Sequence, residues 1–469
     1  MKTILVESRE TRVERQESKC RNIGISKFLF LISFAVVLFS SCQKEELPEF
    51  KLVRQTIAEG EVVDSLLSNI TFVYSQPITL LDSTLITLTD CQISSETAGA
   101  TLRMEISGLR GESQYTLRIG KGAIQDRNGQ LLDDMTVTFN TSGEREIVVQ
   151  LAVQKALGSA SLPTLKVYKF LRDNYGLRTL SATMANVSFN TNEAQWVHKH
   201  TGKWPAMNCV DFIHMGEEYA NYDNMDAMQD WYDNNGLILG CWHWRVPVSE
   251  GNTARDFYAQ NNKFNVANAT VAGTWENAYL EEDIQNLITV LQQFKDRNIP
   301  VIWRPFHEAA GGWFWWGTGS GEDYVKLWQW MFNKLVKEAR LNNLIWVWTT
   351  EMDDDSWYPG DDYVDIIGRD IYNNNSGTAL ASQFAEIQRK YPNRIITLSE
   401  CGSVATIPTQ WMAGARWSWF MPWYDAGRTR SVVSNEFNGT NHEHANISWW
   451  NAAFGNRYVL TRDDLPAWK

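Results

Sequence analysis

The feature that most constrains the fold is an alternation of apolar, strand-like runs with amphipathic segments from residue 144 to the C-terminus. The segments between the runs, such as Glu282–Asn298 and Asp323–Arg340, carry apolar residues at the i, i+3, i+4 spacing of core-facing helices. Eight alternating units of this length predict an α/β fold, a (β/α)8 TIM-type barrel. The eight runs are Leu177–Ala182, Val210–His214, Leu237–Trp242, Val301–Arg304, Leu344–Trp348, Val364–Gly368, Ile395–Leu398 and Ala415–Phe420.

A different pattern precedes the barrel. Short alternating strands separated by polar turns predict a small β-sandwich. The run Gly122–Gln130 resembles bacterial Ig-like domains, and the segment contains no Trp that could form a sugar platform. We therefore interpret it as an Ig-like spacer, with carbohydrate binding as the alternative. Its expected strands are Ile70–Tyr74, Leu85–Leu88, Thr101–Ile106, Tyr115–Ile119 and Thr136–Phe139.

The N-terminal segment has the pattern of an export signal. Basic residues precede the uncharged run Phe28–Phe39, which is too short to span a bilayer as a helix. Small residues then lead directly to Cys42, an arrangement that resembles a bacterial lipobox, in which this Cys becomes the lipidated first residue. The following Gln43–Glu46 resembles the acidic export tag of Bacteroidetes surface lipoproteins. We expect a lipid anchor in the outer membrane that faces the cell surface.

Together these patterns predict four parts. They are a signal peptide at residues 1–41, a linker at 42–49, an Ig-like sandwich at 50–143 and a barrel domain at 144–469. We expect the chain to be monomeric.

Charge and tryptophan content indicate the class of ligand. The formal net charge is -12, whereas nucleic-acid binding requires clustered Lys and Arg, so nucleic acid is excluded as the main partner. All 22 Trp lie between Trp196 and Trp468. Aromatic rings stack on the apolar faces of sugars, although Trp is also a large core residue. The six Cys match no zinc-binding spacing.

Two glutamates follow predicted strands. Glu308 comes after the fourth run and Glu400 after the seventh. The C-terminal ends of barrel strands carry the chemistry of this fold, and a pair of carboxyl groups is what glycoside cleavage needs. Acids at strand ends also form ordinary ion pairs with residues such as Arg304, so the pattern alone leaves both interpretations open.

Five stretches make the resemblance specific. They are Trp242–Pro247, Trp303–Gly317, Asp370–Tyr372, Ser399–Gly402 and Leu460–Pro466. From about Ile147 onward the chain resembles glycoside hydrolase family 26, which consists mainly of endo-β-1,4-mannanases. The resemblance implies retaining hydrolysis of mannan-type polysaccharides, with Glu308 as general acid/base and Glu400 as nucleophile, and it implies no metal and no other cofactor.

The resemblance also implies a set of residues that contact the reacting sugar. Tyr372 would hydrogen-bond the nucleophile, and the aromatic floor would be Trp423. Of the Trp315–Trp316 doublet we expect one ring to face the sugar and one the barrel. The implied substrate-binding residues are His243, His307, Trp313, Trp316, Asp370, Tyr372 and Trp423.

Some stretches depart from the family pattern. Tyr424–Asp425 stands where several mannanases have an Arg-Asn pair, and the fifth strand ends in Thr349–Glu351 rather than a Thr-Pro-like sequence. These positions leave the glycan open, with β-1,3/1,4-glucan or β-1,3-xylan as alternatives, and a non-catalytic surface glycan-binding lipoprotein as a further one. We interpret His442–His444 as a solvated loop, with a metal site as the alternative.

Overall fold

The computed structural model describes residues 49–63, 67, 69–142, 147–185, 188–427 and 431–468. The expected signal peptide and Cys42 lie outside the described residues. Phe50–Lys469 form one compact unit. Among the described residues, no helix combines the length and apolar character needed to cross a membrane.

The N-terminal part of this unit is a β-sandwich, as the alternation predicts. Its sheets have the strand orders β1-β3-β7-β6 and β2-β10-β8-β5, and β4 pairs with β9. Inward-facing residues of both sheets, such as Phe72 and Leu117, form one buried cluster. The strands are β1 Leu52–Gln55, β2 Val62–Val63, β3 Asn69–Tyr74, β4 Ile78–Leu80, β5 Ile86–Leu88, β6 Gln92–Ala98, β7 Thr101–Ser107, β8 Gln114–Ile119, β9 Ile124–Asp126 and β10 Met135–Thr141.

The C-terminal part is a closed parallel barrel, as predicted. The strands run in the order β11-β12-β13-β16-β17-β18-β19-β20, and β11 pairs with both β12 and β20 to close the ring. The short strand β21 Val459–Leu460 also pairs in parallel with the first residues of β11. The barrel strands are β11 Thr179–Met184, β12 Met207–Asp211, β13 Leu237–Trp242, β16 Val301–Pro305, β17 Leu344–Thr349, β18 Ile366–Tyr372, β19 Ile395–Gly402 and β20 Trp419–Pro422.

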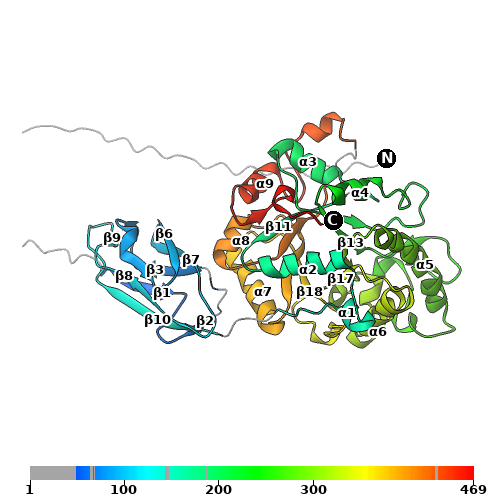
Figure 1. The fold of residues 1–469 in the computed structure, drawn as a ribbon, viewed down its shortest axis with the longest axis horizontal. Coiled ribbons are helices and arrows are strands. Elements are labelled where there is room, and N and C mark those ends of the chain that lie inside the picture. The colour runs from blue at the N-terminus through cyan, green and yellow to red at the C-terminus, as the bar shows by residue number, and fades with distance from the viewer. Residues whose placement is uncertain are drawn as a thin grey trace, which may run out of the picture. The chain divides into compact units, whose positions relative to one another are not determined.

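Helices surround the barrel strands (Figure 1). The N-terminus of α6 is fixed by a capping box between Ser320 and Asp323. The expected helix Asp323–Arg340 is interrupted, because the α-helix ends at Phe332 and a π-helical turn continues to Glu338. The helices are α1 Ala152–Leu157, α2 Leu162–Asn174, α3 Asn192–Thr201, α4 Asp226–Asp233, α5 Trp275–Asp296, α6 Gly321–Phe332, α7 Gly377–Lys390, α8 Ile407–Ala413 and α9 Ile447–Phe454, and β14 Val246–Pro247 pairs with β15 Arg255–Asp256.

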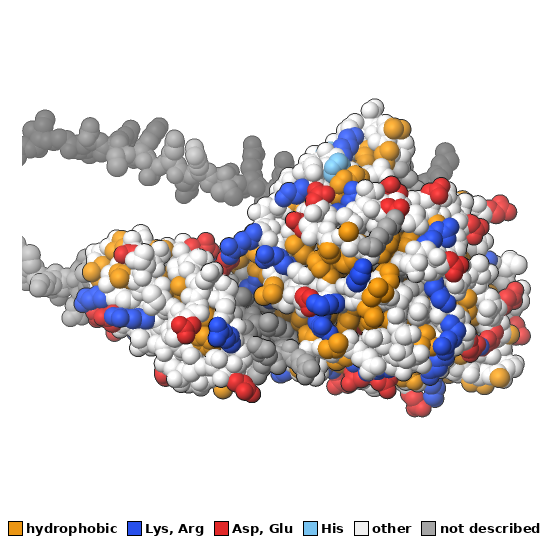
Figure 2. All heavy atoms as spheres, viewed as in Figure 1, with side chains coloured by type: hydrophobic (Ala, Val, Ile, Leu, Met, Phe, Trp, Pro, Cys, Tyr) orange, Lys and Arg blue, Asp and Glu red, His pale blue; other side chains and the backbone are white. Residues whose placement is uncertain are grey.

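Most of the tryptophan content belongs to the core. Twelve of the 22 Trp are almost completely buried, including Trp303 in β16 and Trp346 in β17. The compositional link between Trp and sugar stacking therefore applies only to a minority of these rings. On the face seen in Figure 2, basic side chains are interrupted by acidic ones, unlike the clustered Lys and Arg of nucleic-acid-binding surfaces.

Candidate active site

Two glutamates lie at the C-terminal end of the barrel, as predicted. Glu400 belongs to β19 and is 5% exposed, and Glu308 follows β16 and is partly exposed. The backbone of Glu308 has a φ of 53°, a left-handed conformation that is strained for a non-glycine residue. Phe306, Asn373 and Ser403, which also follow barrel strands, share this conformation. Left-handed backbone therefore occurs at the ends of three barrel strands, and it also occurs at described residues far from them, such as Asp90 and Arg340.

Glu400 is held by a cation and a phenol. Arg304 donates from Nη2 to Glu400 Oε2 over 2.5 Å, and Tyr372 donates its hydroxyl to Glu400 Oε1 over 2.6 Å. Arg304 also donates to Asp370 Oδ2 over 2.7 Å, and Ser399 donates to the other oxygen of Asp370. Register places Asp370 beside Glu400 on adjacent strands. Arg304 thus forms the ion pairs that the sequence left open, and it forms them with Glu400 itself.

Glu308 has fewer polar partners than Glu400. Trp313 donates its indole N–H to Glu308 Oε2 over 2.9 Å, and the Trp313 side chain is 43% exposed. This ring lies so close to Gly311 that a Cβ there would approach its carbons to 2.1 Å. Gly311 is therefore required for the close approach of Trp313, which in turn orients Glu308.

The two carboxyl groups have different electrostatic surroundings. Burial and the charges of Asp370, Glu400 and Glu351 raise the pKa of Glu308 to about 9. Burial and the charge of Asp370 also raise the pKa of Glu400, but Arg304, His243 and Tyr372 act in the opposite direction. Because Arg304 and Tyr372 contact the charged form of Glu400 directly, the negative charge of the pair belongs on Glu400 and the proton on Glu308.

Two histidines predicted for the site lie in contact with each other. His307 and His243 approach to 3.0 Å between their Nε2 atoms, and both residues are buried. Asp211 of β12 contacts the other ring nitrogen of His243, with Oδ2 at 2.6 Å from His243 Nδ1. Asp211 was not predicted as a site residue: the predicted strand was Val210–His214, whereas the observed strand β12 ends at Asp211 and so places this side chain at the same edge of the barrel.

An aromatic shell surrounds the histidines. Trp423 follows β20 and meets the His243 ring at 5.5 Å between centroids. Phe314, which was not predicted as a site residue, packs against both His243 and His307. Phe314 could have been found from its position inside the Trp303–Gly317 stretch.

The expectation for the Trp315–Trp316 doublet is wrong. Both rings are completely buried, so neither faces a sugar. Trp315 donates its indole N–H to the backbone oxygen of Trp244, and Trp316 donates to that of His307. Trp316, in the turn after β16, therefore holds the backbone of His307 and has no exposed surface with which to bind a substrate.

His442–His444 is more ordered than a solvated loop, which corrects the sequence interpretation. His442 Nδ1 accepts from the backbone N–H groups of His444 and Ala445, each over 3.0 Å, and its Nε2 lies 3.2 Å from a Glu193 oxygen. The His444 ring packs edge-on against Tyr372. Both ring nitrogens of His442 thus have hydrogen-bond partners, and the neighbouring His444 ring packs against the ring of Tyr372.

One group of described residues has the donor atoms that a metal ion would need. Ligand atoms of Asp211, Cys241 and His243 lie within 4.8 Å of one another, and all three residues are buried. However, both Asp211 oxygens already accept hydrogen bonds, and burial raises the pKa of the Cys241 thiol well above its ordinary value. A protonated thiol is a poor metal ligand, so we interpret the group as a hydrogen-bond network.

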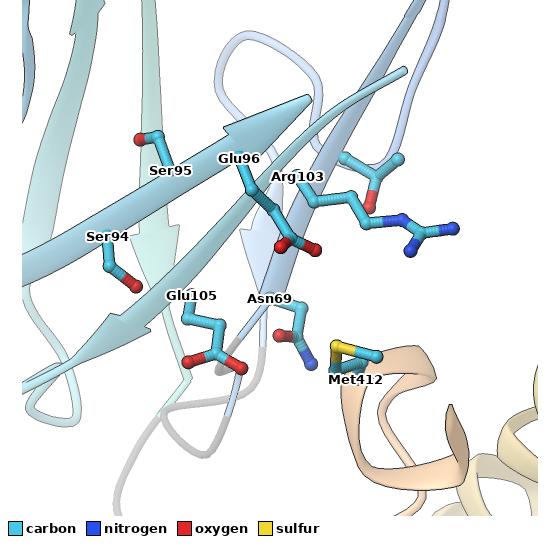
Figure 3. Close-up of a pocket in the computed structure, with 8 residues that line it drawn as sticks. Asn69, Ser94, Ser95, Glu96, Arg103, Glu105 and Met412 are labelled. Atoms are coloured by element: carbon cyan, nitrogen blue, oxygen red, sulfur yellow. The ribbon is translucent and has the colours of Figure 1, made fainter. Parts of the chain in front are cut away.

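A pocket is lined mainly by polar residues of the sandwich strands β3, β6 and β7, together with Met412 of α8. Figure 3 shows Glu96 and Arg103, which are register partners on β6 and β7, with Asn69 and Glu105 nearby. Among the described residues that line this pocket, none is aromatic. The pocket therefore lacks the flat rings on which sugars stack.

Comparison with known proteins shows which family this chain resembles. The family model described as Glycosyl hydrolase family 26 matches residues 158–464. A mannan endo-1,4-β-mannosidase A from Piromyces sp is 30% identical over 312 residues, which cover 64% of this chain and 49% of that protein. A mannan endo-1,4-β-mannosidase from Thermothelomyces thermophilus is 30% identical over 329 residues, 66% of this chain and 63% of that protein. The chain thus spans less than two thirds of the length of these relatives.

The match extends over almost the whole of two solved chains. The GH26 domain of an endo-β-mannanase/endo-β-glucanase from Prevotella bryantii has a TM-score of 0.61 and 35% identity, covering 68% of this chain and 99% of that one. A β-mannanase from a symbiotic protist of the termite Reticulitermes speratus, in complex with a gluco-manno-oligosaccharide, has a TM-score of 0.60 and 30% identity, covering 69% and 100%.

Proposed function

The chain belongs to glycosyl hydrolase family 26, and from this premise we propose that it is a retaining, endo-acting enzyme that cleaves β-1,4-mannosidic bonds in mannan, galactomannan or glucomannan. The observation that carries the proposal is the unequal pair of carboxyl groups. Glu400 is charged and is held by Arg304 and Tyr372, whereas burial and neighbouring carboxylates keep Glu308 protonated. The descriptions of the similar proteins as mannanases support the choice of polysaccharide.

In the proposed reaction, Glu400 attacks the anomeric carbon while the bond to the leaving sugar oxygen breaks. Glu308 gives its proton to that oxygen, so that a neutral hydroxyl departs and a glycosyl ester of Glu400 remains. Glu308, now ionised, then removes a proton from a water molecule that attacks the same carbon and releases Glu400. Two inversions give net retention, and both glutamates return to their starting states.

The remaining residues have binding roles in this proposal. His243 and His307 contact hydroxyl groups of the sugar on the non-reducing side of the cleaved bond, and Trp423 forms the floor beneath that sugar. Asp370 orients Arg304 and lies close to the floor. Trp313 lies beside the leaving group, which its exposure and its hydrogen bond to Glu308 support.

We further propose that the mature chain is attached to the outer membrane through a lipid on Cys42 and that the Ig-like sandwich is a spacer that holds a monomeric enzyme away from the surface. The lipobox-like sequence and the lack of aromatic rings in the sandwich pocket support this arrangement. Metabolic labelling with a clickable fatty acid tests it. The expected result is label on the native chain and none on Cys42→Ala, and label on neither would overturn the anchor.

Product analysis tests the proposed activity. Residues 43–469 are incubated with linear mannan, galactomannan, glucomannan, mixed-linkage glucan and β-1,3-xylan, with Glu400→Gln as the inactive control. The expected result is short manno-oligosaccharides from the native chain alone. Cleavage of only the glucan or the xylan would overturn the mannan assignment, and binding without cleavage would overturn the enzyme.

A further inference from the structure

Both carboxylate oxygens of Asp211, at the end of β12, contact His243. Oδ1 accepts from the backbone N–H of His243 over 3.1 Å and from that of Ile213 over 3.0 Å, and Oδ2 lies 2.6 Å from His243 Nδ1. The side chains of Asp211 and His243 are 4% and 9% exposed. A carboxylate only accepts hydrogen bonds, so His243 Nδ1 carries a hydrogen and the ring has one fixed orientation.

The contact between the two histidines then leaves two arrangements. Their Nε2 atoms are 3.0 Å apart, so one nitrogen donates a hydrogen and the other accepts it. Either His243 carries hydrogens on both nitrogens and donates to His307, or His243 is neutral and accepts from His307. In the first arrangement His307 carries its hydrogen on Nδ1, and in the second its Nδ1 is a bare acceptor.

The surrounding charges select the first arrangement. His243 has the Asp211 carboxylate on one side, the Cys241 thiol on its own strand, and the Glu400 carboxylate close enough to be affected by its charge. His307 is buried and lies within the field of the Arg304 guanidinium. A positive charge is therefore favoured on His243 and disfavoured on His307. The pKa values agree in direction: burial lowers that of His243 but Asp211 raises it to about 10, and burial and Arg304 hold that of His307 well below its ordinary value.

His307 Nδ1 supplies an independent observation. It is a buried nitrogen with no hydrogen-bond partner among the described residues. A buried polar atom without a partner is costly, and such atoms occur where a ligand completes the hydrogen bonding. The residue is 1% exposed and directly precedes Glu308, so the unpaired nitrogen belongs to the reacting end of the barrel.

We propose that Asp211 is a positioning residue that keeps His243 as an imidazolium, and that His307 consequently presents Nδ1–H as a hydrogen-bond donor to a sugar oxygen. The first half concerns the chain alone, and only the identity of the acceptor rests on the proposed function. The imidazolium also acts on Glu400, because its positive charge favours the ionised carboxylate. Asp211 would thus influence the nucleophile through His243 without touching the substrate.

The direct test is nitrogen NMR of the full chain labelled with ¹⁵N-histidine, with His243→Gln and His307→Gln used for assignment. Between pH 5 and 8 the expected spectrum has both nitrogens of His243 protonated and His307 protonated at Nδ1 alone. A neutral His243 in this range would overturn the proposal, whatever substrate the enzyme has. This measurement needs only the native chain and the assignment variants.

The variant Asp211→Asn tests the cause. It is expected to leave His243 neutral in the same pH range and to reduce kcat/KM at pH 5 about tenfold more than at pH 8, because the nucleophile loses a neighbouring positive charge. Asp365→Asn is the matched control, since Asp365 is equally buried and accepts from the backbone N–H groups of Ala152 and Trp346, away from the histidines. Asp365→Asn should leave the His243 signals unchanged.

Two outcomes would contradict this assignment. A doubly protonated His243 in folded Asp211→Asn would show that Asp211 does not control its charge. An equal loss of activity at pH 5 and pH 8 would show a purely structural role. If the native chain cleaves no mannan but its His243 is doubly protonated, the proposed function fails and the role of Asp211 stands.

Discussion

Removing the hydroxyl of Tyr372 is the most informative single change, because the substitution Tyr372→Phe keeps the ring and deletes one hydrogen bond. That bond joins the Tyr372 hydroxyl to Glu400 Oε1 over 2.6 Å, and it lowers the pKa of Glu400. Arg304 still holds the other oxygen in the variant. The nucleophile should therefore stay in position but bind a proton more readily.

The magnitude follows from the type of bond. A hydrogen bond to a charged group contributes about 1.5–3 kcal/mol, which corresponds to about a 10- to 150-fold change in the ratio of ionised to protonated carboxyl. The pKa of Glu400 rises when the bond is lost, so the ionised fraction falls at low pH and recovers at high pH. We expect kcat/KM to fall by up to this factor at the acidic end of the profile and by much less near pH 8.

The assay is kcat/KM on a soluble manno-oligosaccharide from pH 4 to 9. Tyr168→Phe is the matched control, because it also loses a buried hydroxyl, one that donates to the backbone oxygen of Val148. The control should keep the native profile. A uniform loss at every pH in Tyr372→Phe, or an unchanged acidic limb, would refute the reasoning that Tyr372 keeps Glu400 ionised.

Three further predictions concern the neighbours of the carboxyl pair. Glu308→Gln should slow cleavage of mannan about 10²- to 10⁴-fold but affect aryl glycosides with good leaving groups far less, since these need no proton, and equal losses on both would exclude the acid role. Glu351 is partly buried beside Arg369, and its charge raises the pKa of Glu308. Glu351→Gln should therefore move the alkaline limb of the pH profile to lower pH, and a shift to higher pH would contradict this sign. Gly402→Ala would bring a Cβ to 2.4 Å from His444 and 2.6 Å from the Tyr372 ring, so we expect a loss of about 1–3 kcal/mol in thermal unfolding together with reduced activity, whereas Gly427→Ala should match the native chain in both.

The fold was accessible from the sequence because most barrel strands contain a short apolar run. The second strand is the exception, since it was expected at Val210–His214 and lies at Met207–Asp211, where polar residues interrupt the apolar ones. Strands such as Leu237–Trp242 and Leu344–Thr349 are buried along their whole length, so their apolar composition identifies them as strands without knowledge of the strands they pair with. The strand Gln92–Ala98 was missed, because it carries polar side chains on its exposed face and its place in the sheet depends on pairing with β7.

The site was only partly accessible, for reasons that differ between residues. Glu308 and Glu400 could be predicted because they lie at strand ends, where barrels of this fold carry their catalytic residues. Asp211 has its partner, His243, 32 positions further along the chain, and no local pattern predicts that distance. The doublet Trp315–Trp316 lies in a short 3-10 turn, where two adjacent rings can both point inward, so the expected alternation of one exposed and one buried ring failed.

The same limit applies to His442. Its neighbours in the sequence are polar and predict a solvated loop, yet its side chain is 3% exposed because Glu193 of α3 binds it from a distant part of the chain. Buried polar residues with distant partners are therefore the part of this site that a sequence alone does not predict.

The stereochemistry of the first product tests the central proposal most directly. Proton NMR of mannohexaose during the first minutes of hydrolysis distinguishes the anomers before they interconvert. We expect internal cleavage with the β-anomer formed first, the outcome that goes with carboxyl groups about 5–5.5 Å apart. Formation of the α-anomer first would contradict Glu400 as the nucleophile, and an uncleaved mannohexaose would contradict the mannanase itself.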